Sequence, residues 1–115
     1  MSPAYWEALK RRAQSVLDTT LAQLPPEVLA EAQKVPCLFE QENAEDPDML
    51  GLYCDFSPGE VSDANGPIIL YLAAIEAFCL EEAGDFETEV RLTYLHELGH
   101  HLGWDEGDLE ARGLG

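Results

Sequence analysis

The chain has 115 residues, close to the usual size of one domain, and 46% of them are hydrophobic, which is ordinary for a globular protein. Its 23 acidic residues outnumber 6 basic ones and give a formal net charge of -17. This charge argues against nucleic acid and anionic membranes as partners, because binding to either begins with Lys or Arg neutralising phosphates. We therefore expect one domain over residues 1–115, with neither kind of partner.

The cysteines and the N-terminus indicate the cellular compartment. Cys37, Cys54 and Cys79 are widely spaced and form no Cys-x-x-Cys pair, which predicts free thiols rather than a disulfide framework or a thiolate zinc site. The N-terminal segment MSPAYWEALKRR carries its basic residues after the apolar ones, unlike a secretory signal, and no later stretch is long enough to span a membrane. We expect a cytoplasmic protein.

The first predicted element is a helix over about residues 3–23. Ser2 and Pro3 have the pattern of an N-cap and a first-turn proline, and the helical spacing stops at Pro25 and Pro26. The expected apolar face consists of Tyr5, Leu9, Ala13, Val16 or Leu17, and Leu21. A second, short helix is expected to begin at Pro26 in PEVLAEAQK.

Two strands are expected next. VPCLFEQ from Val35 is a short apolar run, in which Pro36 favours an edge strand or a strand start. NAEDPDML has turn chemistry, and LGLYCDF from Leu50 is the second strand. SPGEVSDANGP, residues 57–67, is dense in strand and helix breakers and is predicted to be a loop; loops of that length are often functional.

The last third of the chain reads as one more strand followed by two helices. IILYLAAIEAFCLEEAG predicts a strand at about residues 68–72 that runs into a helix ended by Gly84. Asp85 is the predicted N-cap of the next helix, over 86–101. The core face of that helix is expected to contain Phe86, Val90, Tyr94, Leu95 and Leu98.

All three histidines of the chain lie on the helix predicted over 86–101, within six residues. Because a helix advances about 100° and 1.5 Å per residue, His96 and His100 differ by about 40° in direction and about 6 Å in height, so both rings can reach one metal ion. Glu97 completes the motif H-E-x-x-H, in which two neutral imidazoles hold zinc and the glutamate accepts a proton from water. His101 points elsewhere and is expected not to be a ligand. The same five letters also occur on helices that bind no ion.

A third ligand is available just after the motif. Gly103 follows His100 by three residues, where a helix C-terminus favours glycine. An unbroken helix would carry residue 106 about 15 Å from His96, so only a chain reversal can return a carboxylate to the ion. The competing residues are Asp105, Glu106, Asp108 and Glu110.

The segment VRLTYLHELGHHLGWDE, preceded by LGLYCDF and GPIILYLAAIEAF, resembles the single-domain minimal zincins of bacteria, which are zinc metallopeptidases. The likeness runs from about Pro26 to the end of the chain. It implies a compact α+β domain in which a small mixed sheet of about three strands packs against helices. It also implies an active-site helix near the C-terminus that carries Glu97 as the general base, with His96, His100 and Glu106 as ligands of Zn²⁺.

The sequence departs from this family in two respects. Members more often have Asp or His at the third ligand position, which makes Glu106 a longer side chain than usual and keeps Asp105 as the alternative. The Met-turn of the related metzincins is absent, because Met1 and Met49 both precede the motif.

The leading functional hypothesis is a zinc-dependent peptidase that acts on peptide or protein substrates with a metal-activated water. Candidates for stabilising the oxyanion are Tyr53, Tyr71, Tyr94 and Arg91. The alternative is a metal-binding module without turnover. A third hypothesis, an endoribonuclease with an H-x-x-x-H-x-x-G-x-x-H site, is disfavoured by Glu97, by the missing last histidine and by the net charge.

Overall fold

The computed structural model describes residues 1–54, 67–104 and 106–111, without the side chains of Glu106, Leu109 and Glu110. The predicted loop over 57–67 lies, apart from Pro67, outside the described residues. The described part forms five helices and three strands: α1 (Pro3–Ala22), α2 (Pro26–Ala32), β1 (Cys37–Glu40), β2 (Gly51–Tyr53), β3 (Ile68–Tyr71), α3 (Leu72–Glu82), α4 (Phe86–Leu102) and α5 (Glu106–Ala111). This confirms the predicted α+β class.

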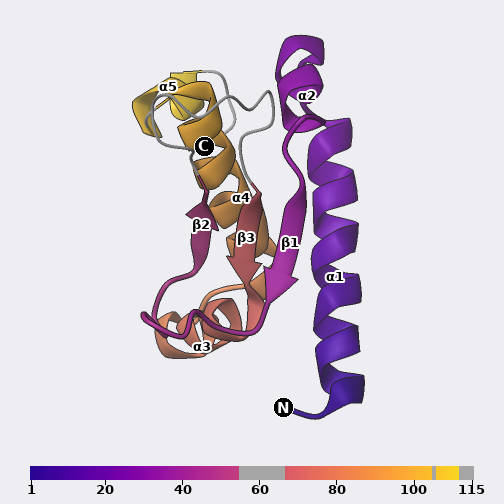
Figure 1. Ribbon diagram of the computed structural model, residues 1–115, viewed down its shortest axis with the longest axis vertical. Coiled ribbons are helices and arrows are strands. Elements are labelled where there is room, and N and C mark those ends of the chain that lie inside the picture. Colours follow the sequence, from indigo (N-terminus) through magenta and orange to yellow (C-terminus); the bar gives the residue numbers. More distant parts are fainter. Residues whose placement is uncertain (55–66, 105, 112–115) are drawn as a thin grey trace.

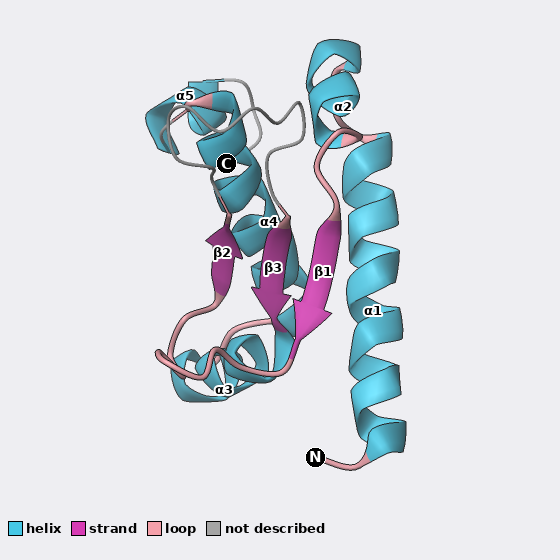
Figure 2. Ribbon diagram, viewed as in Figure 1, coloured by secondary structure: helices cyan, strands magenta, loops and turns pink. Residues whose placement is uncertain are grey.

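The three strands form one small mixed sheet that helices flank (Figure 2). Their order is β1-β3-β2, with β1 parallel and β2 antiparallel to the central β3, so β1 and β2 are the two edges. Ile68 and Leu70 of β3 are fully buried, and Cys37, Phe39 and Tyr53 of the neighbouring strands pack against the same core. The sheet therefore buries one set of alternating side chains, as the two-residue period of strands requires.

Helix α4 is the centre of the packing (Figure 1). It contacts β2 and β3, and both α1 and α3 pack against it. The last turns of α4 lie at the same end of the molecule as α2 and α5, whereas the N-terminus and α3 lie at the opposite end (Figure 1). Residues from α2, β2 and α4 are thereby brought together although they are far apart in the sequence.

Helix α1 has the predicted N-terminus and most of the predicted apolar face. The Ser2 hydroxyl accepts a hydrogen bond from the Tyr5 N–H at 3.1 Å, as an N-cap should. The helical spacing allowed either Val16 or Leu17 on the apolar face, and Leu17 is the one that is buried. Tyr5 was wrongly predicted to face the core: it is 43% exposed, and its phenol donates a hydrogen bond to the Glu76 carboxylate.

The predicted strand-to-helix transition in the second half is confirmed, but its end differs in detail. Helix α3 ends with Ala83, not Gly84, in the left-handed conformation, at φ 54° and ψ 37°. The Gly84 N–H then bonds to the Cys79 carbonyl at 2.9 Å. A non-glycine residue therefore occupies a left-handed position, at which helices that end in this way usually have glycine.

Both ends of α4 form as predicted. The Asp85 carboxylate accepts a hydrogen bond from the Thr88 N–H at 3.0 Å, and Gly103 ends the helix at φ 71°. The five predicted core residues are all buried. The Trp104 N–H reaches the Gly99 carbonyl at 2.8 Å, which completes a Schellman-type turn.

The cysteines and the lengths of the helices bear on two smaller expectations. Cys37, Cys54 and Cys79 are free thiols, and burial raises the pKa of Cys37 to about 12, which makes that thiol unreactive. Among the described residues, no helix is both long and apolar enough to cross a membrane.

Candidate metal centre

Helix α4 brings His96, Glu97 and His100 together. The Nε2 atoms of the two imidazoles lie 3.3 Å apart, and one potential ligand atom from each of the three residues lies within 4.8 Å of the others. Both histidines are exposed, whereas Glu97 is buried. The four-residue spacing therefore has the predicted consequence that both rings converge on one point in contact with solvent.

The donor set fits a zinc ion. Imidazole nitrogens bind zinc at about 2.0–2.1 Å, and two such nitrogens on a tetrahedral ion are roughly 3.3–3.4 Å apart. The observed separation of 3.3 Å equals that value. A direct N–H···N hydrogen bond between two neutral rings has a similar length, so the geometry is also compatible with a metal-free pair.

Glu97 differs from the histidines in its surroundings. Its side chain is only 8% exposed, and this desolvation raises the pKa of the carboxyl group, against the opposing effects of His100, His96 and a hydrogen bond from the Tyr53 backbone N–H. A carboxyl group with a raised pKa, held beside two imidazoles that could bind a metal ion, has properties that suit a general base.

Strand β2 forms the wall next to these residues. A hollow of about 330 Å³ is lined by Gly51, Leu52, Tyr53, Glu97 and His100. Gly51 permits the close approach, because a Cβ atom on it would lie 2.7 Å from Thr93 Cγ2 and 3.2 Å from Glu97 Cγ. The hollow thus exists because glycine lets an edge strand lie directly on the histidine helix.

His101 faces away from the other two histidines, as predicted. Its Nδ1 lies 3.0 Å from the Tyr53 hydroxyl and its Nε2 lies 3.3 Å from Glu31 Oε2. Its side chain is 11% exposed. His101 therefore links α2, α4 and β2 just behind the hollow.

Only one of the four candidates for oxyanion stabilisation lies at the hollow. Tyr53 lines it, whereas Tyr71 is buried and accepts a hydrogen bond from Asn43 at 3.0 Å. Tyr94 is 2% exposed, and burial raises the pKa of its phenol to about 12. Arg91 points about 140° to 180° away from the two histidines around α4.

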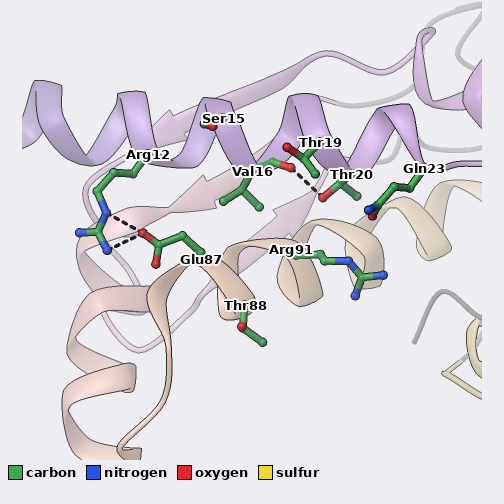
Figure 3. A pocket seen from close by; sticks show the side chains of 9 residues that line it. All are labelled: Arg12, Ser15, Val16, Thr19, Thr20, Gln23, Glu87, Thr88 and Arg91. Atoms are coloured by element: carbon green, nitrogen blue, oxygen red, sulfur yellow. Dashed lines mark hydrogen bonds and ion pairs between the residues drawn. The ribbon is translucent and has the colours of Figure 1, made fainter.

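Arg91 instead lines a second, larger hollow of about 410 Å³ between α1 and α4 (Figure 3). Two polar contacts are drawn there: Arg12 bonds to Glu87 at 2.8 Å, and the Thr20 hydroxyl bonds to the Val16 carbonyl at 2.8 Å. The described residues that line this groove include neither histidine nor cysteine. Size alone would favour this groove, but the chemistry favours the smaller hollow.

The segment after α4 bears on the third ligand. Gly103 ends α4, and α5 begins at Glu106 and contacts α4, so the regular helix is interrupted after the histidines. The side chain of Glu106 and the whole of Asp105 lie outside the described residues, and the choice between these two ligands stays a prediction.

Two residues near the hollow were not identified from the sequence. Glu31 is 70 residues from His101 and carries no local signal that would connect the two. Gly51 offered a weak signal, because glycine within a predicted strand often marks a close approach of another element.

Comparison with known proteins supports a metal centre. The family model described as zincin-like metallopeptidase matches residues 19–115, which include β1 to β3 and the whole of α4. A search of curated proteins finds no match.

Proposed function

The chain belongs to the zincin-like metallopeptidase family, and from this premise we propose that it is a zinc-dependent peptidase with its active site at the hollow between β2 and α4. The observation that carries the proposal is the 3.3 Å separation of the His96 and His100 nitrogens beside the buried Glu97 carboxyl group. Neither feature is needed to complete the core, and together they supply two ligands and a base.

His96 and His100 are the proposed ligands, with Glu106 as the third. Zinc held there would supply an acidified water and a Lewis acid for the scissile carbonyl. We assign Glu97 as the general base and not as a ligand. Among the described residues, its carboxyl group is the only one beside both imidazoles, so no other described carboxylate could act as the base. Asp105 is the alternative third ligand.

Glu97 accepts a proton from the attacking water and later transfers it to the leaving amine. Its raised pKa suits both transfers, since a base works best when its pKa approaches the working pH. The Tyr53 N–H fixes the direction of the carboxylate, because it donates a hydrogen bond to it. Burial also keeps bulk water from competing for that carboxylate.

The substrate is proposed to be an extended peptide or a flexible protein segment. The hollow is small, and β2 beside it is an edge strand to which an extended chain can add by backbone hydrogen bonds. The net charge of -17 favours basic substrates by weak, salt-dependent steering. Nucleic acid and membranes are not proposed as partners, and the proposed domain comprises residues 1–115.

The decisive experiment separates metal binding from turnover. Purified protein should contain about one zinc per chain, His100→Ala should lose it, and His101→Ala should keep it, since His101 contacts Tyr53 and Glu31 instead. Glu97→Gln should keep zinc and lose hydrolysis of a peptide library, because the amide cannot accept a proton. An anomalous-scattering map at the zinc edge locates the ion directly.

Three outcomes would overturn parts of the proposal. Full zinc content in His100→Ala would remove the metal assignment and leave the two histidines as a hydrogen-bonded pair. Zinc binding without hydrolysis by the parent would instead favour a metal-binding module without turnover. Equal hydrolysis by the parent and by Glu97→Gln would remove Glu97 from the mechanism.

A further inference from the structure

The groove between α1 and α4 contains polar side chains that bond to no other described residue (Figure 3). Its walls come from one face of α1, from Arg12 to the C-cap residue Gln23, and from the first turns of α4, from Glu87 to Arg91. Its volume of about 410 Å³ lies within the range of small-molecule sites. The side chains without a partner in the described part of the chain are those of Ser15, Thr19, Gln23 and Arg91.

Arg91 is the most unusual of these residues, because the chain has 23 acidic residues and only 6 basic ones. Lys10, Arg12 and Lys34 each form an ion pair with a glutamate, and Arg11 is exposed to solvent. Arg91 is partly buried, yet it forms no ion pair with any carboxylate that the structure describes. A partly desolvated guanidinium gains more from an anion than a fully solvated one does, because charges attract more strongly at lower dielectric.

The groove is positively charged at one end. Glu87 is its only described acidic residue, and Arg12 neutralises that charge with contacts of 2.7 and 2.8 Å to one carboxylate oxygen. This ion pair lies at one end of the groove, whereas Arg91 and Gln23 lie at the other (Figure 3). The Debye length is about 8 Å at physiological salt, so the distant acidic residues oppose an anion at Arg91 only weakly.

Neutral donors accompany the guanidinium at this end. Thr19 and Gln23 lie one turn apart on the same face of α1, and a hydroxyl and an amide can each donate a hydrogen bond to an oxyanion. The planar fork of arginine matches the oxygens of a carboxylate or a phosphate. Val16, which packs against the core, gives the groove an apolar surface beside these polar groups.

We propose that this groove binds a small organic anion, whose carboxylate or phosphate group is held by Arg91 together with Thr19 and Gln23, and whose apolar part lies on Val16. The site is separate from the candidate metal centre, because Arg91 points about 140° to 180° away from the two histidines around α4. The inference therefore does not depend on the proposed peptidase function.

The test is a titration of the purified, ¹⁵N-labelled protein with glutarate and, separately, with inorganic phosphate. Chloride keeps the ionic strength constant, so that general screening does not change. The amide resonances of Thr19, Gln23 and Arg91 should shift and saturate, with a Kd of about 1 mM or tighter for the anion that fits better. The anion that binds more tightly identifies the group as a carboxylate or a phosphate.

Variants test the assigned contacts. Arg91→Gln should weaken binding at least about 10-fold, the usual effect of losing hydrogen bonds to a charged group, and Arg91→Lys should restore part of the loss. Thr19→Val, which removes only a hydroxyl, should weaken binding about 2- to 10-fold. Arg11→Gln is the matched control: it removes one positive charge from the exposed surface of α1 and should change the Kd less than about 2-fold.

Three results would overturn the inference. The first is the absence of saturable shifts at the groove with either anion. The second is equal weakening by Arg91→Gln and Arg11→Gln, which would mean unspecific attraction to positive charge. The third is a set of shifts confined to β2 and to the last turns of α4, which would place the anion at the candidate metal centre. The ¹⁵N spectrum of each variant without anion shows that the variant is folded.

Discussion

Gly51 of β2 lies directly against Glu97 of α4: a Cβ atom on the glycine would stand 3.2 Å from the Glu97 Cγ and 2.7 Å from the Thr93 Cγ2. Such overlap forces either the strand or the helix side chains to move, so Gly51→Ala should destabilise the protein by about 1–3 kcal/mol, as overpacking does. Gly51→Ala should also lower the rate of Glu97-dependent peptide hydrolysis by a larger factor than it lowers the zinc content of the protein. Denaturant unfolding and zinc analysis of the same samples test both statements.

Gly84→Ala is the matched control for this substitution. A Cβ atom at Gly84 would meet only Cys79 atoms at 3.7 Å or more, which is ordinary contact. Replacing Gly84 with alanine should change the free energy of unfolding by less than about 1 kcal/mol. The change should be stabilising, because alanine reduces the conformational entropy of the unfolded chain. Equal losses in the two alanine variants would show that the close packing of Gly51 on α4 is not responsible.

Ala83 is the second backbone position with a clear consequence. Its φ of 54° is left-handed, a conformation in which a Cβ atom costs roughly 1 kcal/mol and glycine costs nothing. Ala83→Gly should therefore stabilise the protein by about 0.5–1 kcal/mol in denaturant unfolding. Ala77→Gly, at an exposed interior position of α3, should have the opposite sign and cost about 1 kcal/mol.

The Asp85 cap predicts a specific dependence of stability on pH. Hydrogen bonds from the Thr88 hydroxyl and N–H lower the pKa of Asp85 below its ordinary value of 3.8. A group with a lowered folded-state pKa stabilises fully above its unfolded pKa and loses this effect as pH falls through the folded value. Asp85→Ala should thus be less stable than the parent at pH 7, and the difference should shrink below about pH 4.

Comparing Asp85→Ala with the parent protein at each pH cancels the effect of the many other acidic groups on stability. Thr88→Val provides a second check, because it removes the hydroxyl donor but keeps the backbone donor. It should have a smaller effect than Asp85→Ala, with the same direction of pH dependence. A difference between Asp85→Ala and the parent that stays constant from pH 7 to pH 3 would contradict the assignment of the cap.

The features that the sequence predicts well are those set by neighbours along the chain. Ser2, Asp85 and Gly103 each mark a helix end through local capping chemistry, and the structure has these ends where expected. The pairing of His96 with His100 is equally local, since a helix of 3.6 residues per turn brings them together in any fold.

The features that were missed depend on distant parts of the chain. Tyr5 has the spacing of a core residue, but α3 places Glu76 beside it at the surface. Neither the contact of Glu31 with His101 nor that of Gly51 with Glu97 follows from spacing, because each requires knowing which elements pack together. Ala83 was missed for a different reason: propensity favours the adjacent glycine, and in the structure the left-handed residue comes one position earlier.

The third ligand gives the last prediction. Helix α5 begins at Glu106, so residues 106 and 110 lie on nearly one face of it, whereas residue 105 precedes it. In competition with a chelator of known affinity, Glu106→Ala should weaken zinc binding at least about 100-fold, more than the loss of an outer-shell partner does. Asp105→Ala and Glu110→Ala should have much smaller effects. The exposed Glu81 of α3, at the other end of the molecule, gives the control for losing one negative charge, and Glu81→Ala should leave zinc affinity nearly unchanged. A strong loss in Asp105→Ala alone would mean that the turn after Gly103 presents the residue one position earlier, and a strong loss in Glu110→Ala alone would mean that the ligand comes from the next turn of α5.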